Sequence, residues 1–453
     1  MDRAAPVSGA PGAIADYNRR VARDAAAALE QAAWLHGAFQ QAGITFAGTP
    51  MRSFLRPHLV ERAAWNTLRD TGRALLELAA RVARRVFDGD AGRLCAYLGI
   101  PAAQARWMSL DPGEPDVLLS RLDAFVTAEG PRFIEINSDA PAGFGYGDRM
   151  AEVFRRLPLF QEFAAAHRLA YVPSAPPLVE AVLGQWRRRG GSAVPVVAIV
   201  DWSDVKTRPD QEILRDALEA AGARCVLADP REMALREGRL CAGPDAVDVV
   251  YRRALLTELV EREGEVGPFL SAYRDGRALF VNSFRCGLSE DKAFFGIFTD
   301  EAFAGLMTAE ERDLVARTVP WTRRVEERRT LKDGRRVDLV PFVLAHAAEL
   351  VLKPAHGYGG QSVLVGVEAT PAAWQSTVER ALASPWVVQE RVPIPREEFP
   401  VCDEGRLAFE PLGVNANPFY AAGAEAGAVA RASRSAVINV SAGGGSVPTF
   451  VVG

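Results

Sequence analysis

The sequence predicts a mixed α/β (α+β) protein, and three observations support this prediction. Residues 1–110 carry apolar side chains at three- and four-residue spacing, which is the period of an amphipathic helix. Residues 176–285 alternate short apolar runs with helical patterns, as in a parallel βαβ sheet. Residues 121–137 read as two alternating segments joined by a short turn, as in a β-hairpin. Because 453 residues are too many for one core, we expect several lobes.

The composition favours a soluble protein that acts on small molecules. The net charge is only -4, so the charge balance does not indicate a nucleic acid or an anionic membrane as partner. No apolar run reaches about 18 residues and the first residues lack the core of a signal peptide, so we expect a cytoplasmic protein. The 5 cysteines include no CxxC pair, which argues against a disulfide framework or a structural zinc site.

The first region of the chain is expected to be helical. Residues 13–41 and 57–87 carry the helical pattern, and the glycine- and proline-containing residues 43–57 separate them. The histidines of the chain form no HxH or HExxH ligand pattern. We therefore predict that these helices serve mainly to pack against other lobes.

The register of the predicted hairpin follows from its side-chain alternation, because a slip by one residue exchanges the two faces. If Asp123 lies opposite Glu135, one face is entirely apolar and suits a core. That face consists of Leu122, Ala124, Val126, Ile134 and Ile136. Residues 128–130 would then form a three-residue loop. The opposite face is mostly polar and consists of Arg121, Asp123, Phe125, Thr127, Phe133, Glu135 and Asn137.

The polar face of this hairpin brings two carboxylates together. Carboxylates opposed on neighbouring strands repel each other, at a cost of up to about 1 kcal/mol, unless a cation lies between them. A divalent metal would remove this repulsion. The oxygens of Asp123, Glu135 and Asn137 are hard ligands that suit Mg2+ or Mn2+ better than zinc. The alternative is a solvated strand face on which Arg121 pairs with one of the carboxylates.

A second candidate segment follows a short apolar strand at residues 350–352. It begins with Lys353, and its glycines are Gly357, Gly359 and Gly360. Such a loop can bring backbone N–H groups close to phosphate oxygens, and the lysine adds a positive charge. Neither the Walker A pattern nor the dinucleotide GxGxxG pattern is present. The alternative is a tight turn that opens a hairpin. His356 lies in this loop and could contact phosphate, but an exposed loop histidine is the favoured interpretation.

These two segments resemble those of the circularly permuted ATP-grasp family, specifically the synthetase domain of glutathionylspermidine synthase. In that family an Arg-x-Asp is followed by a Glu-x-Asn at the spacing found here for Arg121-Leu-Asp123 and Glu135-Ile-Asn137. The resemblance implies that Asp123, Glu135 and Asn137 bind magnesium. It also implies that Arg121 is catalytic and faces the transferring phosphate and the developing acyl centre.

The resemblance extends to the lysines. Residues 288–293 look like the lysine-bearing segment of the family, so Lys292 and Lys353 become candidates for binding the ATP phosphates. Ser289 is expected to cap the helix that carries Lys292. In ordinary ATP-grasp enzymes the lysines precede the Glu-x-Asn strand, whereas here they follow it. A circular permutation would produce this order.

Two further segments resemble nucleotide-binding parts of the family. Residues 386–392 look like the strand and hinge that hold adenine, which implies that Gln389 and Glu390 lie at adenine and ribose. Residues 430–445 resemble the end of permuted relatives. The resemblance there offers three candidates for phosphate contact, which are Arg431, Arg434 and Asn439. A glycine-rich turn after a strand is the alternative reading of this stretch.

The patterns and the resemblance divide the chain into four parts. Residues 1–110 form a helical N-terminal region, and residues 111–175 hold the metal-binding hairpin with its following helices. Residues 176–285 form a βαβ pre-ATP-grasp lobe that helps to hold substrate. Residues 286–453 form the ATP-grasp nucleotide-binding lobes.

Charged residues in the last two parts have more than one interpretation. Asp201, Arg252 and Arg253 lie at or just past predicted strand ends, where open α/β sheets place ligands. The favoured interpretation is that they are only polar residues that end a strand. A basic cluster within residues 323–336 could attract an anionic substrate, but its interleaved acids favour a mixed-charge solvated surface.

The resemblance implies an ATP- and Mg2+-dependent carboxylate–amine ligase that forms an amide through an acyl phosphate. Its substrates would be a small-molecule or short-peptide carboxylate and an amine. Ala140, Ala142 and Gly143 stand where the synthetase has hydroxyl or thiol residues near glutathione, so glutathione is not expected as a substrate. A phosphotransferase on the same fold and a nucleotide-binding protein without turnover are the alternatives.

Overall fold

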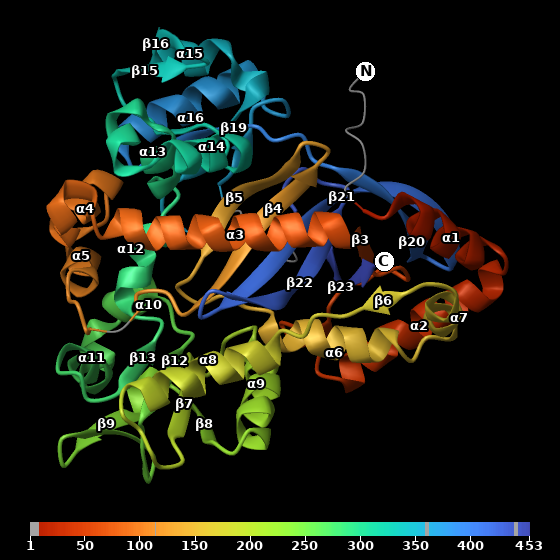
Figure 1. The fold of residues 1–453 in the computed structure, drawn as a ribbon, viewed down its shortest axis with the longest axis horizontal. Coiled ribbons are helices and arrows are strands. Elements are labelled where there is room, and N and C mark those ends of the chain that lie inside the picture. The colour runs from red at the N-terminus through yellow and green to blue at the C-terminus, as the bar shows by residue number, and fades with distance from the viewer. Residues whose placement is uncertain (1–8, 114, 358–361, 439–442) are drawn as a thin grey trace.

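The computed structural model describes residues 9–113, 115–357, 362–438 and 443–453. A large sheet occupies the centre, with a parallel-sheet lobe on one side and a smaller antiparallel lobe on the other (Figure 1). Helices pack against each of these three main sheets. This arrangement confirms the predicted mixed α/β fold class.

The central sheet joins segments from both ends of the sequence. Its strands follow the order β3-β23-β22-β21-β4-β5, and in addition β20 pairs with β21 and β6 with β23. Their bounds are His58–Glu61 (β3), Leu119–Thr127 (β4), Gly130–Asn137 (β5), Leu169–Ala170 (β6), Arg396–Asp403 (β20), Arg406–Ala421 (β21), Ala424–Ser433 (β22) and Gly445–Val452 (β23). Because β4 pairs with β21, the predicted hairpin lies directly beside strands from the far end of the chain.

The hairpin of β4 and β5 has the predicted register at its polar end. Asp123 pairs with Glu135, and Arg121 pairs with Asn137. After Asp123 the register shifts by a β-bulge, so the turn contains two residues instead of the predicted three. The strand β5 therefore contains one residue more than predicted, and the turn contains one fewer.

The bulge exchanges the faces of two side chains, and here the sequence-based prediction was wrong. Phe133 pairs with Ala124 and is fully buried in the core, whereas Ile134 lines a cavity on the opposite face. A bulge inserts one unpaired residue and so reverses the alternation beyond it. Side-chain alternation could not reveal the bulge, because a bulge with a two-residue turn uses the same number of residues as a regular hairpin with a three-residue turn.

Helix α3 (Arg62–Ala83) runs along one face of the central sheet (Figure 1). Its contact with β21 is close at Gly72, where an added Cβ would lie 2.0 Å from the hydroxyl oxygen of Tyr420. That hydroxyl donates to the carbonyls of Leu68 (3.2 Å) and Arg69 (3.1 Å). The helix can approach the strand this closely because residue 72 has no side chain.

The rest of the N-terminal region is helical as predicted, with local corrections. The first predicted helix is divided at Asp24, which accepts a hydrogen bond from the N–H of Ala27 (3.0 Å) and so caps a new helix. The second begins late, because residues His58–Glu61 form β3 and pair with β23. The remaining elements are α1 (Pro11–Ala22), α2 (Ala25–Gln41), β1 (Thr45–Phe46), β2 (Thr49–Pro50), α4 (Ala91–Leu98) and α5 (Ala102–Met108).

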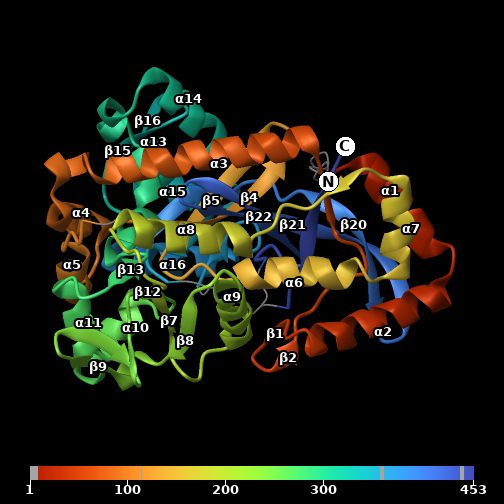
Figure 2. The same cartoon turned by 60° about the horizontal axis from the view of Figure 1, so that its bottom comes forward.

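The predicted βαβ region contains a four-stranded parallel sheet in the order β13-β12-β7-β8, which confirms the expected alternation. Helices α6 and α8 lie between this sheet and the central sheet (Figure 2). The elements of this part are α6 (Phe144–Phe154), α7 (Pro158–Ala166), α8 (Ala175–Arg188), β7 (Val196–Val200), α9 (Arg208–Ala220), β8 (Arg224–Ala228), β9 (Met233–Arg236), β10 (Arg239–Ala242), β11 (Asp245–Ala246), β12 (Val249–Arg252), α10 (Leu256–Glu261), α11 (Gly267–Arg274) and β13 (Leu279–Val281).

The antiparallel lobe has a four-stranded sheet in the order β14-β19-β17-β18. The short helix α12 leads into it from the parallel-sheet lobe. The elements are α12 (Gly287–Glu290), α13 (Phe294–Thr299), α14 (Ala309–Thr318), β14 (Thr322–Arg324), β15 (Arg329–Lys332), β16 (Arg335–Asp338), α15 (Leu339–Ala345), β17 (Leu350–Pro354), β18 (Leu364–Val365), α16 (Pro371–Ala383) and β19 (Trp386–Glu390). No helix in the described ranges is both long and apolar enough to cross a membrane.

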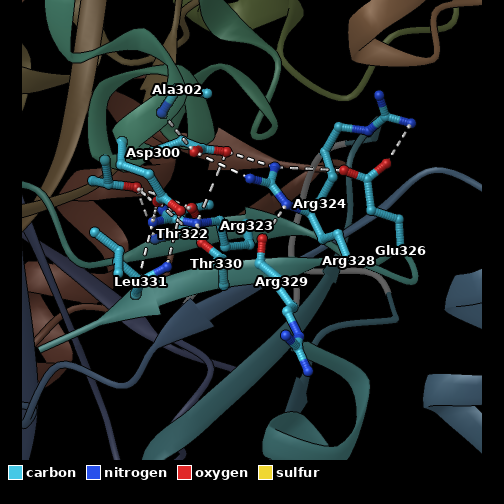
Figure 3. Close-up of polar contacts among 12 residues, drawn as sticks. Asp300, Ala302, Thr322, Arg323, Arg324, Glu326, Arg328, Arg329, Thr330 and Leu331 are labelled. Carbon is cyan, nitrogen blue, oxygen red and sulfur yellow. Dashed lines mark hydrogen bonds and ion pairs between the residues drawn. The ribbon is translucent and has the colours of Figure 1, made fainter. Parts of the chain in front are cut away.

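The basic cluster of this lobe is only partly the solvated surface that the sequence favoured, because some of its arginines are exposed and others are buried or half-buried. Arg323 is 1% exposed and donates to the hydroxyl of Thr330 (2.6 Å) while pairing with Glu301 (3.1 Å) (Figure 3). Arg328 pairs with Asp300 at 2.6 Å. These contacts attach the β15–β16 hairpin to the lobe, so part of the cluster is structural.

The α3–β21 contact gives a stability prediction. Gly72→Ala is expected to lower the free energy of unfolding by about 1–3 kcal/mol, because the Tyr420 ring must shift and lose its hydrogen bonds. Gly37→Ala is the matched control, since its Cβ would meet nothing within 4 Å in α2. The control is expected to be neutral or stabilising by up to about 1 kcal/mol. Urea unfolding of both variants checks this, and a neutral Gly72→Ala would contradict the close packing.

Candidate active site

A cavity of about 1170 Å3 lies where the central sheet and the two lobes meet. Most of the residues that the sequence singled out line it, although they come from separate parts of the chain. They are Arg121, Asp123, Glu135, Asn137, Lys292, Lys353, Gly357, Gln389, Glu390 and Arg431. The predicted phosphate contacts Gly359, Gly360 and Asn439 lie outside the described residues.

Asp123 lies at the centre of a group of cations. Its carboxylate pairs with Arg121 at 2.9 Å and with Arg431 of β22 at 3.2 Å, and the amide of Asn137 donates to it (3.1 Å). Burial alone would raise the pKa of Asp123, but the charges of Arg121 and Arg431 outweigh burial and lower it. Burial and the charge of Arg121 lower the pKa of Arg431 to about 10.

Glu135, on the strand beside Asp123, pairs with Lys292 at 2.9 Å. The same ammonium donates to the carbonyl of Gly357 (2.7 Å). Burial disfavours the charge of Lys292, but Glu135 more than compensates, so the pKa of Lys292 is raised. The predicted cap was wrong, because Ser289 lies inside α12 and donates to the carbonyl of Cys286 (3.3 Å). Lys292 follows this short helix instead of projecting from it.

Lys353, at the end of β17, is almost completely buried. Its ammonium donates to the side-chain oxygen of Gln389 on β19 (2.7 Å), and Gln389 in turn donates to Thr322 (3.0 Å). Burial and the charge of Lys292 lower the pKa of Lys353 from 10.5 to about 8. Glu390 lies next to Gln389 at the cavity wall, 3.8 Å from the ammonium of Lys332.

The start of the glycine loop is attached to the protein through His356. Its Nδ1 lies 2.5 Å from Asp291, and its Nε2 lies 3.0 Å from the carbonyl oxygen of Gly99. Burial would lower the pKa of His356, but the hydrogen bond with Asp291 raises it. His356 is therefore not the exposed loop residue that the sequence suggested. It lines the cavity and holds the chain just before Gly357.

Arg434 is not placed as the sequence suggested. Its side chain is 54% exposed and pairs with Glu410 at 2.6 Å, and it does not line the cavity. Arg431 lies three positions earlier, where the strand still alternates, and it faces inward. Arg434 follows the end of β22, so its direction is set by the turn. The resemblance offered both arginines, and only the tertiary structure separates them.

Glu290 also belongs to the cavity wall, although no sequence pattern identified it as a site residue. Its carboxylate accepts hydrogen bonds from the N–H groups of Ser138 (2.8 Å) and Asp139. Burial and the charge of Asp139 raise the pKa of Glu290 to about 8. Its position two residues before Lys292 was the signal that could have identified it.

The strand ends of the parallel sheet contribute to the same cavity in part. Asp201 and Arg253 line it, and burial raises the pKa of Asp201 to about 6. Arg252 is fully buried instead and pairs with Asp139 at 2.6 Å. Of the two interpretations given to these residues, the ligand-facing one suits Asp201 and Arg253. The structural one suits Arg252.

The donor set of the hairpin fits a divalent cation. Asp123, Glu135 and Asn137 present two carboxylates and one amide oxygen on neighbouring strands of the cavity wall, which is a set that Mg2+ or Mn2+ accepts. Both carboxylates already require positive charge beside them, which the arginines and Lys292 supply here. Across the ranges that the structure describes, no group of three or more histidine, cysteine or carboxylate side chains is arranged to hold a metal. The candidate set at the hairpin differs from such a group because its third oxygen donor is the amide of Asn137.

The fold is mixed α/β, and the Glu-x-Asn strand precedes both lysines in the chain. The chain belongs to the circularly permuted ATP-grasp type 2 family, whose model matches residues 118–435. The solved structure of a glutathione synthetase-like effector from Globodera pallida superposes with a TM-score of 0.60 at 14% identity. That match covers 94% of this chain and 97% of the other, and at this identity it shows the fold alone.

Curated relatives include proteins named as ligases. The chain is 28% identical over 339 residues to a proposed glutamate–cysteine ligase 2-2 of Frankia casuarinae, covering 70% of this chain and 36% of that protein. It is 28% identical over 242 residues to an uncharacterised Synechocystis protein, covering 50% and 47%. The chain thus spans less than half the length of these relatives. The comparisons do not single out glutathionylspermidine synthase within the family.

Removing the charge of each lysine is expected to change the stability of the protein in opposite directions. Lys353→Met removes a buried charge, so we expect the ligand-free protein to gain about 1–3 kcal/mol of stability below pH 8. Lys292→Met leaves Glu135 without its ion pair and is expected to cost about 1–3 kcal/mol.

The pH dependence provides the check on this interpretation. Between pH 8 and 10.5 the unfolded chain binds the Lys353 proton more tightly than the folded protein, so wild-type stability rises with pH through this window. The advantage of Lys353→Met should therefore fade over the same window. Urea unfolding of both variants at several pH values measures this. Equal changes of the same sign in the free energy of unfolding of the two variants would contradict the assigned charge states.

Proposed function

We propose that the protein is an ATP-dependent carboxylate–amine ligase, which joins an acid to an amine through an acyl phosphate and releases ADP and phosphate. The convergence of four cations and two opposed carboxylates in one cavity is the observation that supports this most. The cavity, at about 1170 Å3, exceeds the roughly 300–1,000 Å3 of typical small-molecule sites. It has room for a nucleotide and further substrates.

The nucleotide is assigned to the side of the cavity formed by the antiparallel lobe. Lys353 and Lys292 neutralise the phosphates there, and the backbone of the glycine loop assists them. The negative charge of the phosphates raises the pKa of Lys353, so that the lysine is fully charged when ATP is bound. Adenine and ribose are assigned to Gln389 and Glu390 at the end of β19.

The acid is assigned to the neighbourhood of Arg121 and Arg431. A carboxylate oxygen of the acid attacks the γ-phosphorus of ATP, and ADP leaves. The amine nitrogen then attacks the acyl carbon, phosphate leaves and the nitrogen loses a proton. The two guanidinium groups stabilise the negative charge on the transferring phosphate and on the carbonyl oxygen. Magnesium held by Asp123, Glu135 and Asn137 would neutralise the charge of the ATP phosphates.

The substrates are assigned as a small-molecule or short-peptide carboxylate and an amine. The name of the Frankia casuarinae relative, a proposed glutamate–cysteine ligase, supports amino acids in both roles. Ala140, Ala142 and Gly143 form part of the cavity wall and offer no hydroxyl or thiol side chain. This composition argues against a glutathione site like that of glutathionylspermidine synthase.

The decisive experiment is a screen of acid and amine pools for ADP release. A ligase releases ADP only when both an acid and an amine are supplied. A phosphotransferase yields a stable phosphorylated product without an amine, and a nucleotide-binding protein without turnover binds ATP but forms no ADP. Either of the last two results would reject the ligase.

Single variants test the site once activity is found. Arg431→Gln and Asp123→Asn are each expected to lower kcat/KM for the acid by about 100-fold or more, because they remove charge at the reacting centre. Arg434→Gln is the matched control, since this exposed arginine on the same segment pairs with Glu410 outside the cavity. Steady-state ADP release measures all three. Equal losses in Arg431→Gln and Arg434→Gln would contradict the site.

Metal and nucleotide are expected to bind cooperatively. Without ATP, Arg121 and Lys292 already pair with Asp123 and Glu135, so a metal ion alone must displace them. Phosphates offer these cations new partners. Titration with Mn2+ followed by electron paramagnetic resonance should therefore show an affinity at least about tenfold higher with a non-hydrolysable ATP analogue, a coupling of about 1.4 kcal/mol. Equal Mn2+ affinity with and without the analogue would contradict this coupling.

A further inference from the structure

Arg253 is a buried cation that the assigned roles do not use. It directly follows β12 in the parallel sheet and is 5% exposed, yet it is one of the residues that line the cavity. Its backbone N–H donates to the carbonyl of Val200 (2.8 Å), which fixes the residue at the strand end. One terminal nitrogen of its guanidinium donates to the carbonyl of Pro141.

Arg253 differs from the other buried arginines in its lack of an ion pair. Five arginines in the described ranges are at least nine-tenths buried, and four of them pair with a carboxylate at 2.6–3.1 Å. Those four are Arg56, Arg252, Arg285 and Arg323. Arg253 forms no such pair with any described carboxylate, and its Nε has no hydrogen-bond partner there. A buried charge without a partner is costly, so its retention at a cavity indicates an anionic ligand.

The nearest acidic side chains are committed to other donors. Asp201 accepts from the amide of Gln211 (2.6 Å) and from the N–H of Trp202 (2.9 Å). Asp210 accepts from three N–H groups at the start of α6, which are those of Gly143, Gly145 and Tyr146. Against the effect of burial, the hydroxyl of Tyr251 and, after it, these two carboxylates raise the pKa of Arg253, but neither carboxylate forms an ion pair with it. The guanidinium is therefore available to a ligand in the cavity.

The position of Arg253 limits what that ligand can be. Pro141, which it contacts, follows Asn137 of the metal-type strand by four residues, and four residues span at most roughly 14 Å. A small substrate can bridge this distance from the reacting centre. The ATP phosphates are assigned to Lys292 and Lys353, which lie outside the parallel sheet. The anion at Arg253 is thus a group of another substrate, and the planar guanidinium fork suits a carboxylate.

We propose that Arg253 binds a carboxylate that takes no part in the reaction, so that one of the two substrates carries a free carboxylate besides its reacting group. That the carboxylate belongs to a substrate rests on the proposed ligase function. The presence of an anion site at Arg253 does not rest on it. Two sources share this chemistry. The acid can be a dicarboxylate, or the amine can be an amino acid or a peptide with a free C-terminus.

The site is tested first without turnover, with malonate as the probe. Isothermal titration of the full chain without nucleotide should show saturable malonate binding. Arg253→Gln should weaken it by about tenfold or more, the loss expected when a charge-assisted hydrogen bond is removed, and Arg253→Lys should weaken it less. Arg262→Gln is the matched control, since Arg262 lines the same cavity but lies over the ring of Trp202 (4.4 Å).

Two outcomes of the titration would overturn the proposal. One is wild-type protein that binds no malonate at concentrations up to tens of millimolar. The other is an Arg253→Gln variant that binds malonate as wild type does, which would place the anion at another cation. Unfolding curves of the variants establish that each is folded before the titrations are compared.

The source of the carboxylate is decided by kinetics with the acid and amine that the ADP-release screen yields. Arg253→Gln should raise the KM of one substrate by about tenfold or more while kcat changes little. Amidation of the free carboxylate of that substrate should then raise its KM with the wild-type protein but not with the variant. Unchanged KM values for both substrates would overturn the proposal. A chain that binds malonate at Arg253 but forms no ADP keeps the anion site and rejects the ligase, so the two failures are distinguishable.

Discussion

The structure depends on charges that neutralise one another across segments distant in sequence. Asp123 pairs with Arg121 on its own strand and with Arg431 two strands away, while Glu135 pairs with Lys292 from another lobe. None of these groups could be buried alone, because an isolated charge in a protein interior is strongly unfavourable. The central sheet and the lobes therefore have to meet at this point.

The same constraint explains how the fold builds the cavity. Residue Arg431 reaches Asp123 because β22, β21 and β4 lie side by side in one sheet. Lys292 reaches Glu135 because the chain returns from the parallel sheet through α12 before it enters the antiparallel lobe. Lys353 is held by Gln389 on the adjacent strand β19. A ligand that brings negative phosphates and a positive metal ion would exchange partners within this network without adding uncompensated charge.

Local patterns predicted the parts of the site that depend on neighbouring residues. Alternation predicted the pairing of Asp123 with Glu135, and an apolar run before the glycine loop predicted β17, which ends at Pro354 directly after Lys353. The faces of Phe133 and Ile134 were wrong, because a bulge and a shorter turn use the same number of residues. Ser289 was wrongly assigned as a cap, since the helix begins at the preceding turn. Residues His58–Glu61 were read as helix because their partner strand lies at the far end of the chain.

The sequence by itself determined the class of fold, the register of the polar hairpin and the residue types that suit a metal ion and phosphate. These depend on side-chain periodicity and on chemical type, which are properties of short segments. Only the tertiary structure decided that Arg431 faces the cavity and Arg434 does not, that Glu290 and His356 belong to its wall, and that Arg253 forms no ion pair with a described carboxylate. Those facts depend on which distant groups are brought within a few ångströms, and the free energy of burying charge is set by that neighbourhood and not by the local sequence.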